Sequence, residues 1–325
     1  MEVDAPDLAG LYRRFAEVEA RGSSPTYERL CLAAADAPAV LGLLERLPRG
    51  KRQPNLFLGA LRLLDADVGD PTAALAFALD RADDVVSVMR SRSTQTNEPA
   101  RCAVLLPALA SLSGPLAVLE VGASAGLCLL YDRYRYAYTG VDGLTTTVGD
   151  GDLTLPCSVT GPVPLPDTVP EITARLGLDL NPLDAGDPDV ARWLRCLVWP
   201  EHTERATRLE KALALAAADP PTVLRGRAPD DLPAAVARLR TQAPGATVVV
   251  VHSATVAYLD PPQRASFAQT CRDLGVHRLG LEGAVPTADL GVPVPEQPSA
   301  GRFLVSLDDA VLAHAHPHGR DVTWL

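Results

Sequence analysis

The sequence has almost no lysine and no excess of positive charge. Lys51 and Lys211 are the only lysines among 325 residues, so arginine supplies nearly all of the 30 basic side chains, against 40 acidic ones. The formal net charge is therefore −10. Proteins that bind nucleic acids normally carry a basic stripe that neutralises phosphates, whereas these arginines are scattered among acidic neighbours. We expect no nucleic-acid partner and, instead, a small-molecule substrate.

Long apolar runs and export signals are also missing. Residues 247–251 form the longest apolar stretch of the second half, which has the length of a strand and is far too short to span a bilayer. Residues 1–10 contain three acidic side chains and no basic segment followed by an apolar one, unlike a signal peptide. We expect a cytoplasmic protein without a membrane partner, and its composition is compatible with a homodimer.

Metal-binding patterns are absent as well. The six cysteines are dispersed without a C-x-x-C pair, which suits reduced cytosolic thiols and argues against structural zinc. Three histidines lie close together near the end of the sequence, at positions 314, 316 and 318, but His316-Pro-His-Gly319 has the composition of a turn. No neighbouring carboxylate or thiol completes a ligand set, so we expect no metal.

What the sequence does contain is the composition of a globular protein with two domains. It is 47% hydrophobic and 22% charged, and its length suits two cores. From Leu8 to about Ser113 apolar residues recur at helical spacing, as in Leu41, Leu44 and Leu47, and no β-branched run precedes Pro115. We predict an all-helical domain over residues 1–114 that caps the substrate site of a second domain.

Residues 115–325 have the alternation of an α/β protein. Leu116–Val121 predicts a buried strand, Ala125–Tyr134 a helix that follows it directly, and residues 139–170 an inserted loop or hairpin. Further strands are expected near 174–180, 222–225, 247–251 and 277–281, with helices near 189–197, 204–217, 231–240 and 261–274. Residues 303–307, 311–314 and 322–325 predict an antiparallel meander at a sheet edge. This pattern favours a Rossmann-like class I methyltransferase sheet.

The most informative segment lies between the first strand and its predicted helix, and reads Glu120-Val-Gly122-Ala123-Ser124-Ala-Gly126. It is typical of the turn of a methyltransferase that binds S-adenosylmethionine. In this interpretation Glu120 accepts a charge-assisted hydrogen bond from the amino group of the methionine moiety. Gly122 and Gly126 let the backbone approach the cofactor because they have no Cβ. A glutamate would lie badly beside a pyrophosphate, which disfavours a dinucleotide.

Two other interpretations of this segment stay open. Gly122-Ala123-Ser124-Ala-Gly126 matches the G-x-S-x-G nucleophile elbow of a serine hydrolase literally. In those enzymes the serine follows a strand in the middle of a sheet, whereas no strand is expected before Leu116. Alternatively, Ser124 caps the helix predicted to begin at Ala125, which is compatible with the methyltransferase interpretation.

Asp179 is the candidate for the ribose of the cofactor. It ends the second strand of the series, where a carboxylate can accept from two hydroxyls, and Asn181-Pro182 follows. The alternative is a turn-forming aspartate, and Asp184 is a second candidate. After the third strand, Arg227 cannot accept from an adenine amino group; Asp230 or Asp231 could do so, or could cap the next helix.

Two groups are candidates for the chemistry and for closing the site. His252 ends the predicted central strand, where it could take a proton from an acceptor, and Tyr258 could face the sulfonium or bind substrate. The alternative is a histidine packed under a loop. Gln95 and Asn97 lie with Glu98 before the last helix of the first domain, and could close over the amino-acid end of the cofactor or cap that helix.

Several motifs together resemble a known family. Gln95-Thr-Asn-Glu98, Leu119-Glu-Val-Gly-Ala-Ser-Ala-Gly-Leu127, Asp132-Arg-Tyr-Arg-Tyr136, Val198-Trp-Pro-Glu201 and His252-Ser253 are similar to those of an uncharacterised bacterial family of unknown function. That family is generally regarded as methyltransferase-like, so the resemblance implies the fold more than a reaction. Two positions depart from it: Cys128 stands where the family has asparagine, and Arg227 where it tends to have aspartate.

The sequence therefore predicts an S-adenosylmethionine-dependent transferase, with methyl transfer to a small molecule as the leading hypothesis. Positioning of the acceptor in line with the sulfonium methyl would supply much of the catalysis. Other hypotheses are attack at another carbon of the sulfonium, intramolecular ring closure, a protein that binds the cofactor without turnover, and the serine hydrolase.

Overall fold

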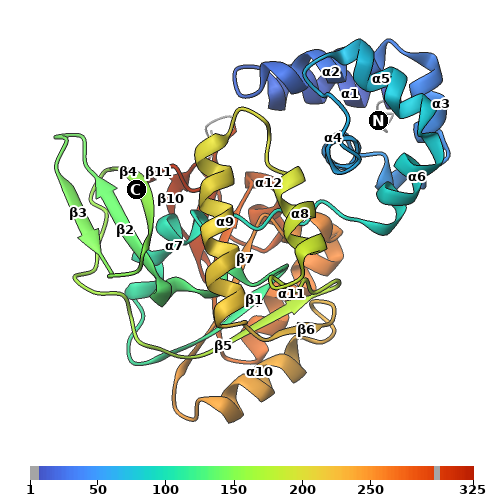
Figure 1. Ribbon diagram of the computed structural model, residues 1–325. Coiled ribbons are helices and arrows are strands. Elements are labelled where there is room, and N and C mark those ends of the chain that lie inside the picture. The colour runs from blue at the N-terminus through green and yellow to red at the C-terminus, as the bar shows by residue number, and fades with distance from the viewer. Residues whose placement is uncertain (1–6, 296–300) are drawn as a thin grey trace. The chain divides into compact units, whose positions relative to one another are not determined.

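A computed structural model describes residues 7–295 and 301–325. Its contacts divide the chain into two units: residues 1–96 with 187–210, and residues 97–186 with 211–325 (Figure 1). The predicted boundary lay between residues 114 and 115. In the structure, α7 (Arg101–Ala110) belongs to the second unit and α8 (Pro188–Cys196) to the first.

The first unit is helical throughout its described residues. It contains α1 (Leu8–Arg14), a π-helical segment (Phe15–Ala20), α2 (Pro25–Ala35), α3 (Pro38–Glu45), α4 (Pro54–Leu63), α5 (Pro71–Asp80), α6 (Ala82–Ser91), α8 and the start of α9 (Thr203–Ala218). Asp70 shows why such helices begin where they do, since its carboxylate accepts from the backbone of Thr72 and Ala73 while Pro71 occupies the first turn. The helical periodicity of the sequence is confirmed here.

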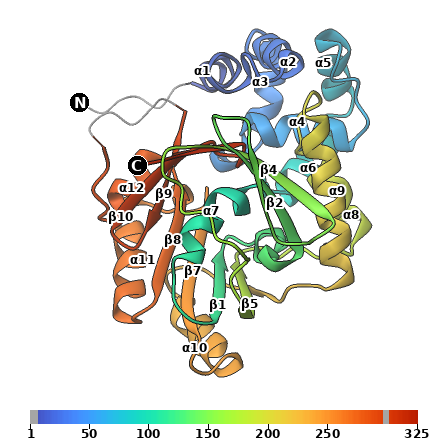
Figure 2. The ribbon, with the colours of Figure 1, turned by 90° about the vertical axis from the view of Figure 1, so that its left-hand side faces the viewer.

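The second unit is built on an eleven-stranded mixed sheet with the order β3-β2-β4-β11-β10-β9-β8-β7-β1-β5-β6. Five neighbouring strands are parallel: β6 (Val223–Arg225), β5 (Ile172–Asp179), β1 (Leu116–Val121), β7 (Thr247–Ser253) and β8 (His277–Glu282) (Figure 2). All four expected strands after residue 170 are confirmed. The chain is thus a mixed α/β protein with a large, mostly parallel sheet.

Helices cover the parallel strands because apolar residues occupy both faces. α10 (Leu232–Gln242) and α11 (Pro261–Asp273) pack on one face through a buried cluster that includes Leu119, Val250 and Phe267. Residues 248–251 are apolar and buried at every position, as the sequence predicted for a central strand. The short α12 (Ala284–Asp289) follows β8.

The helix predicted at Ala125–Tyr134 is wrong. Two 3₁₀ turns (Leu127–Leu129 and Tyr131–Arg133) lead instead into β2 (Tyr134–Thr139). The cause is the alternation of Tyr134, Tyr136 and Tyr138, which are buried on one face and whose hydroxyls donate to backbone carbonyls. A period of two residues predicts a strand, and it outweighs the helical propensity of the preceding segment.

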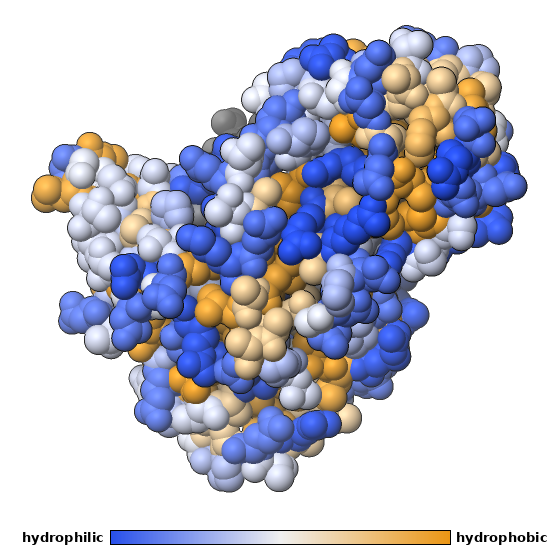
Figure 3. Space-filling model, in the orientation of Figure 1, coloured by the Kyte–Doolittle hydropathy of each residue, from blue (hydrophilic) through white to orange (hydrophobic). Residues whose placement is uncertain are grey.

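The segment predicted as an inserted loop or hairpin, residues 139–170, forms strands of the main sheet. Its pairing determines the position of the C-terminal antiparallel meander. β2 pairs with β3 (Thr145–Val148) in an antiparallel hairpin whose turn exposes Val141 and Leu144, visible as apolar surface at the left of Figure 3. β4 (Leu153–Thr160) pairs with β11 (Asp321–Trp324), which follows β9 (Phe303–Leu307) and β10 (Ala310–Ala315). The antiparallel meander is confirmed, but it lies inside the sheet and not at an edge, because β4 continues the sheet beyond it.

Candidate functional site

The candidate site lies at the carboxyl end of β1, where the strand order reverses. From β1 the chain continues to β5 and β6 on one side, and then crosses to β7 and β8 on the other. Open α/β sheets bind ligands outside the carboxyl ends of their strands at such a reversal. Glu120 on β1, Asp179 on β5 and His252 on β7 all lie at this edge.

The turn after β1 has an unusual backbone. Gly122, Ser124 and Gly126 all adopt positive φ, of 77°, 53° and 73°. Glycine tolerates this conformation without cost, whereas Ser124 needs support from its surroundings. The backbone N–H of Ser124 donates to Oδ2 of Asp179 at 2.8 Å, and Gly126 N–H donates to the carbonyl of Ala123 at 2.6 Å. The turn is therefore held by the neighbouring strand end.

Protein side chains occupy the space beside both glycines. A Cβ on Gly122 would lie 2.3 Å from Oγ1 of Thr255, and one on Gly126 would lie 2.4 Å from Cγ of Pro221. The sequence analysis attributed these glycines to close approach by a cofactor. In the structure, they allow Thr255 and Pro221 to pack directly on the turn.

Asn97 secures the turn from the other side. Its Nδ2 donates to the carbonyl of Ala123 at 3.2 Å, and its Oδ1 accepts from Leu127 N–H at 2.8 Å. The adjacent Glu98 accepts from Ala100 N–H, and its carbonyl accepts from the thiol of Cys128. The start of α7 is thus tied to the turn. Gln95 lies in the first unit, whereas Asn97 and the turn belong to the second.

Glu120 is the most unusual group at the site. It is 2% exposed, and within the described residues its Oε2 has no hydrogen-bond partner. Burial raises the pKa of the Glu120 carboxyl well above its ordinary value and Cys128 raises it further, while the positive charge of Arg101 lowers it. A buried carboxyl oxygen without a partner is costly unless something else binds it, which makes Oε2 of Glu120 a candidate ligand-binding atom.

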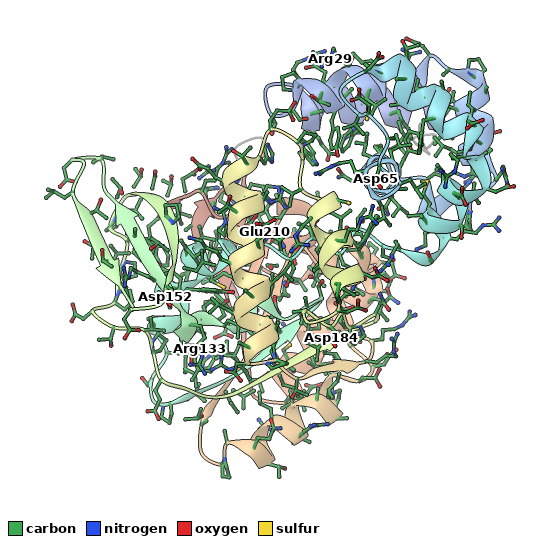
Figure 4. The ribbon with its side chains drawn as sticks, viewed as in Figure 1. Arg29, Asp65, Arg133, Asp152, Asp184 and Glu210 are labelled. Atoms are coloured by element: carbon green, nitrogen blue, oxygen red, sulfur yellow. The ribbon has the colours of Figure 1, made fainter. Side chains whose placement is uncertain are left out.

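The Asp179 carboxylate holds two stretches of backbone. Oδ2 accepts from Ser124 as described, and Oδ1 accepts from Asn181 N–H at 2.7 Å. It therefore forms the turn that was the alternative explanation. Asp184, labelled in Figure 4, is exposed and accepts from Gly186 N–H in the loop after β5.

His252 and Tyr258 lie in different environments, one buried and one exposed. His252 is 0% exposed, its Nδ1 lies 3.0 Å from Oε1 of Glu282, and its ring packs against Phe267 on the α11 face. Tyr258 lies in a 3₁₀ turn (Val256–Tyr258) and is 72% exposed. His252 therefore has the environment of the alternative considered for it, a histidine packed beneath a loop.

The loop after β6 contains the residues considered for the adenine contact. Asp231 does not accept from the first turn of α10; its Oδ2 accepts from the backbone N–H of Arg227 at 2.7 Å. The Asp231 carboxylate thus accepts a hydrogen bond from the same loop that contains Arg227.

The sequence analysis missed three groups around the site. Glu282 is the last residue of β8, and Glu120 is the last but one of β1, so the position of Glu282 at a strand end was a usable signal. Arg101 donates to the carbonyl of Ser253 at 3.1 Å and to that of Pro317 at 3.0 Å, a role that sequence spacing does not reveal. Thr255 carried no signal, since its contact with Gly122 is made only in three dimensions.

No group of three or more histidine, cysteine or acidic side chains that could hold a metal occurs in the described part of the chain. In residues 7–295 and 301–325, no helix is both long and apolar enough to cross a lipid bilayer.

The fold and site define a mixed α/β protein whose parallel strands present a buried carboxyl at the point where their order reverses. More particularly, residues 9–324 match the family described as "Uncharacterized protein conserved in bacteria (DUF2332)", and the chain belongs to that family. The resemblance noted from the motifs is confirmed at the level of the family. Comparison with curated proteins and with solved structures gave no match.

Proposed function

We propose that this protein binds S-adenosylmethionine at the tip of β1 and transfers a group from its sulfonium, most simply the methyl group to a small-molecule acceptor. The observation that carries the proposal is the buried, unpartnered Oε2 of Glu120 at the reversal of the strand order. An ammonium group bound there would supply the missing donor and offset the burial of the carboxylate.

The charged side chains Glu120 and Arg101 suit the amino-acid moiety of S-adenosylmethionine. Glu120 would accept from its ammonium group, and Arg101, whose charge acts on Glu120, would balance its carboxylate. Asp179, at the carboxyl end of β5, would accept from ribose hydroxyls. The bound sulfonium supplies an activated methyl group, whose bond to sulfur breaks as its bond to the acceptor forms.

The order of the strands also favours this function. The five parallel strands with β1 at their centre, followed by an antiparallel β9 beside β8, support the proposal of a Rossmann-like class I methyltransferase sheet. One element departs from that arrangement, since 3₁₀ turns and β2 replace the helix expected after the glycine-rich turn. The support thus comes from the strand ends and not from the segment that follows the turn.

A second candidate function is binding of the cofactor without turnover. It is favoured by the burial of His252, which is bonded to Glu282 and does not face solvent together with Tyr258. If His252 has only a structural role, His252→Asn should reduce the stability of the protein without abolishing group transfer. Turnover is measured by mass spectrometry, as the formation of S-adenosylhomocysteine with a panel of small acceptors. If none of the acceptors gives a product, the result favours a protein that binds the cofactor without turnover.

Calorimetric titration with S-adenosylmethionine and S-adenosylhomocysteine tests the proposal. A charge-assisted hydrogen bond contributes about 1.5–3 kcal/mol, so Glu120→Gln should weaken binding by about 10- to 150-fold. Glu171→Gln is the matched control, because Glu171 precedes β5 at the opposite edge of the sheet. Failure of the wild-type protein to bind either compound refutes the proposal.

The hydrolase hypothesis is tested in the same preparation with a fluorophosphonate probe. Ser124 is buried and follows β1, and no strand precedes β1 in the described residues. This topology differs from that of a nucleophile elbow, which follows a strand in an established sheet. We expect no labelling of Ser124, and covalent labelling there would favour the hydrolase.

A further inference from the structure

Glu282 makes an unusual set of contacts for a residue that no ligand hypothesis uses. Its side chain is 1% exposed, and its Oε1 faces three nitrogen atoms: Nδ1 of His252 at 3.0 Å, the backbone N–H of Thr255 at 2.9 Å and that of Val256 at 3.2 Å. A carboxylate oxygen prefers several such donors, and all of them contact Oε1, whereas the buried Oε2 of Glu282 has no hydrogen-bond partner within the described residues.

These donors all belong to one stretch of chain, the end of β7 and the loop that follows it. Between His252 and Thr255 the chain passes through Ala254, whose φ is +51° and whose Cβ makes this conformation unfavourable. Glu282 therefore compensates for a strained loop by accepting from both sides of the strained residue.

The loop in turn places one side chain against the candidate site. The Thr255 methyl and hydroxyl groups lie directly over Gly122, and its Oγ1 donates to the carbonyl of Ser253 at 3.1 Å. Arg101 donates to that same carbonyl from α7. The ends of β1, β7 and β8 are thus connected through residues 253–256.

We infer that Glu282, together with His252, is a positioning group that fixes the 253–258 loop so that Thr255 forms the wall of the site opposite Gly122. Glu282 acts through the loop and touches no ligand. His252 lies at the ligand-binding edge of the sheet yet is fully buried, because its function is to share the Glu282 oxygen with the loop. The effect on S-adenosylmethionine affinity rests on the proposed function, whereas the effect on the loop does not.

Asp308 provides a matched control. Its carboxylate makes the same kinds of contact at the other end of β8, with Nδ1 of His277 at 2.8 Å and the backbone N–H of Arg278 at 2.9 Å. Asp308→Ala therefore removes a histidine–carboxylate–backbone cluster of the same composition, although a more exposed one, outside the loop after β7.

Hydrogen exchange of the ligand-free protein, measured by mass spectrometry, is the first test. In Glu282→Ala, exchange in the peptide covering residues 253–258 should accelerate by about tenfold or more, the equivalent of one charge-assisted hydrogen bond. Glu282→Gln retains an acceptor at Oε1 and should restore slow exchange. Asp308→Ala should leave this peptide unchanged. Equal acceleration in both alanine variants, or none in Glu282→Ala, would overturn the inference.

Ligand affinity is the second test. Glu282→Ala should weaken S-adenosylmethionine binding by about tenfold relative to Asp308→Ala, and Glu282→Gln should recover most of that loss. If Glu282→Ala does not fold, His252→Asn, which leaves both loop donors in place, should give smaller changes of the same sign. If the wild type binds no S-adenosylmethionine, the proposed function fails while the exchange experiment still decides the positioning role. Unaltered affinity in Glu282→Ala, in a protein whose wild type binds, refutes the positioning role.

Discussion

Replacing Glu120 by glutamine should have opposite effects on stability and on ligand binding. Burial raises the pKa of Glu120, so the folded protein keeps a proton on this carboxyl at pH values where the unfolded chain has lost it. Between the ordinary value of 4.5 and the raised folded value, the native state binds more protons than the unfolded state. The stability associated with Glu120 is therefore fully present below pH 4.5 and decreases as the pH rises.

The magnitude follows from proton linkage. Each pH unit within this window should lower the free energy of unfolding of the wild type by about 1.4 kcal/mol relative to Glu120→Gln, which cannot titrate. Above the folded pKa the difference becomes constant. The glutamine variant should thus gain relative stability towards neutral pH while losing affinity for an ammonium ligand. Opposite effects on stability and on ligand affinity are typical of residues that bind a ligand, and not of residues that only stabilise the fold.

Urea denaturation followed by circular dichroism at a series of pH values from 4 to 8 measures this effect. Glu171→Gln serves as the control for the charge change, and its unfolding free energy should run parallel to that of the wild type. Calorimetry in buffers of different ionisation enthalpy should also detect proton release to the buffer as S-adenosylmethionine binds below the raised pKa of Glu120, because Glu120 must ionise. Parallel stability curves for Glu120→Gln and wild type would refute the reasoning about Glu120.

Three further substitutions test the turn after β1, each by thermal or urea denaturation. Gly126→Ala should destabilise the protein by about 2 kcal/mol or more, because the new Cβ would lie 2.4 Å from Pro221 and the backbone has positive φ at this position. Unchanged stability would show that Pro221 moves freely. Ser124→Gly should change stability by less than about 1 kcal/mol, because glycine accepts a φ of 53°. Asn97→Ala removes two hydrogen bonds to a buried turn and should cost about 1–3 kcal/mol, and a smaller loss would mean that water replaces the amide.

The elements that the sequence predicted well are those determined by local signals. The helix expected at 261–274 is Pro261–Asp273, where Asp260 and Gln263 form a capping box around Pro261. The strand at 247–251 followed from a run of valines. In both cases neighbouring residues specify the structure without help from distant ones.

The errors occurred where distant contacts decide. Residues 125–134 are not helical because the following tyrosines are buried in the sheet, and the meander is internal because β4 pairs with β11. Likewise, the position of Glu120 at a strand end could be predicted, but not that Thr255 would fill the space beside Gly122. Local patterns place a carboxyl on an edge; they do not say which side chain from another strand packs over it.

The pairing of β4 with β11 has a consequence for biosynthesis. Residue 158 is aligned with residue 321, so about half of the sequence must be translated after β4 before its partner exists. Until then β4, β2 and β3 cannot join the rest of the sheet, and one edge of β4 offers unpaired backbone to other nascent chains. Long-range closure of this kind is slow. We expect the newly made protein to depend on chaperones more than its compact parallel core would suggest.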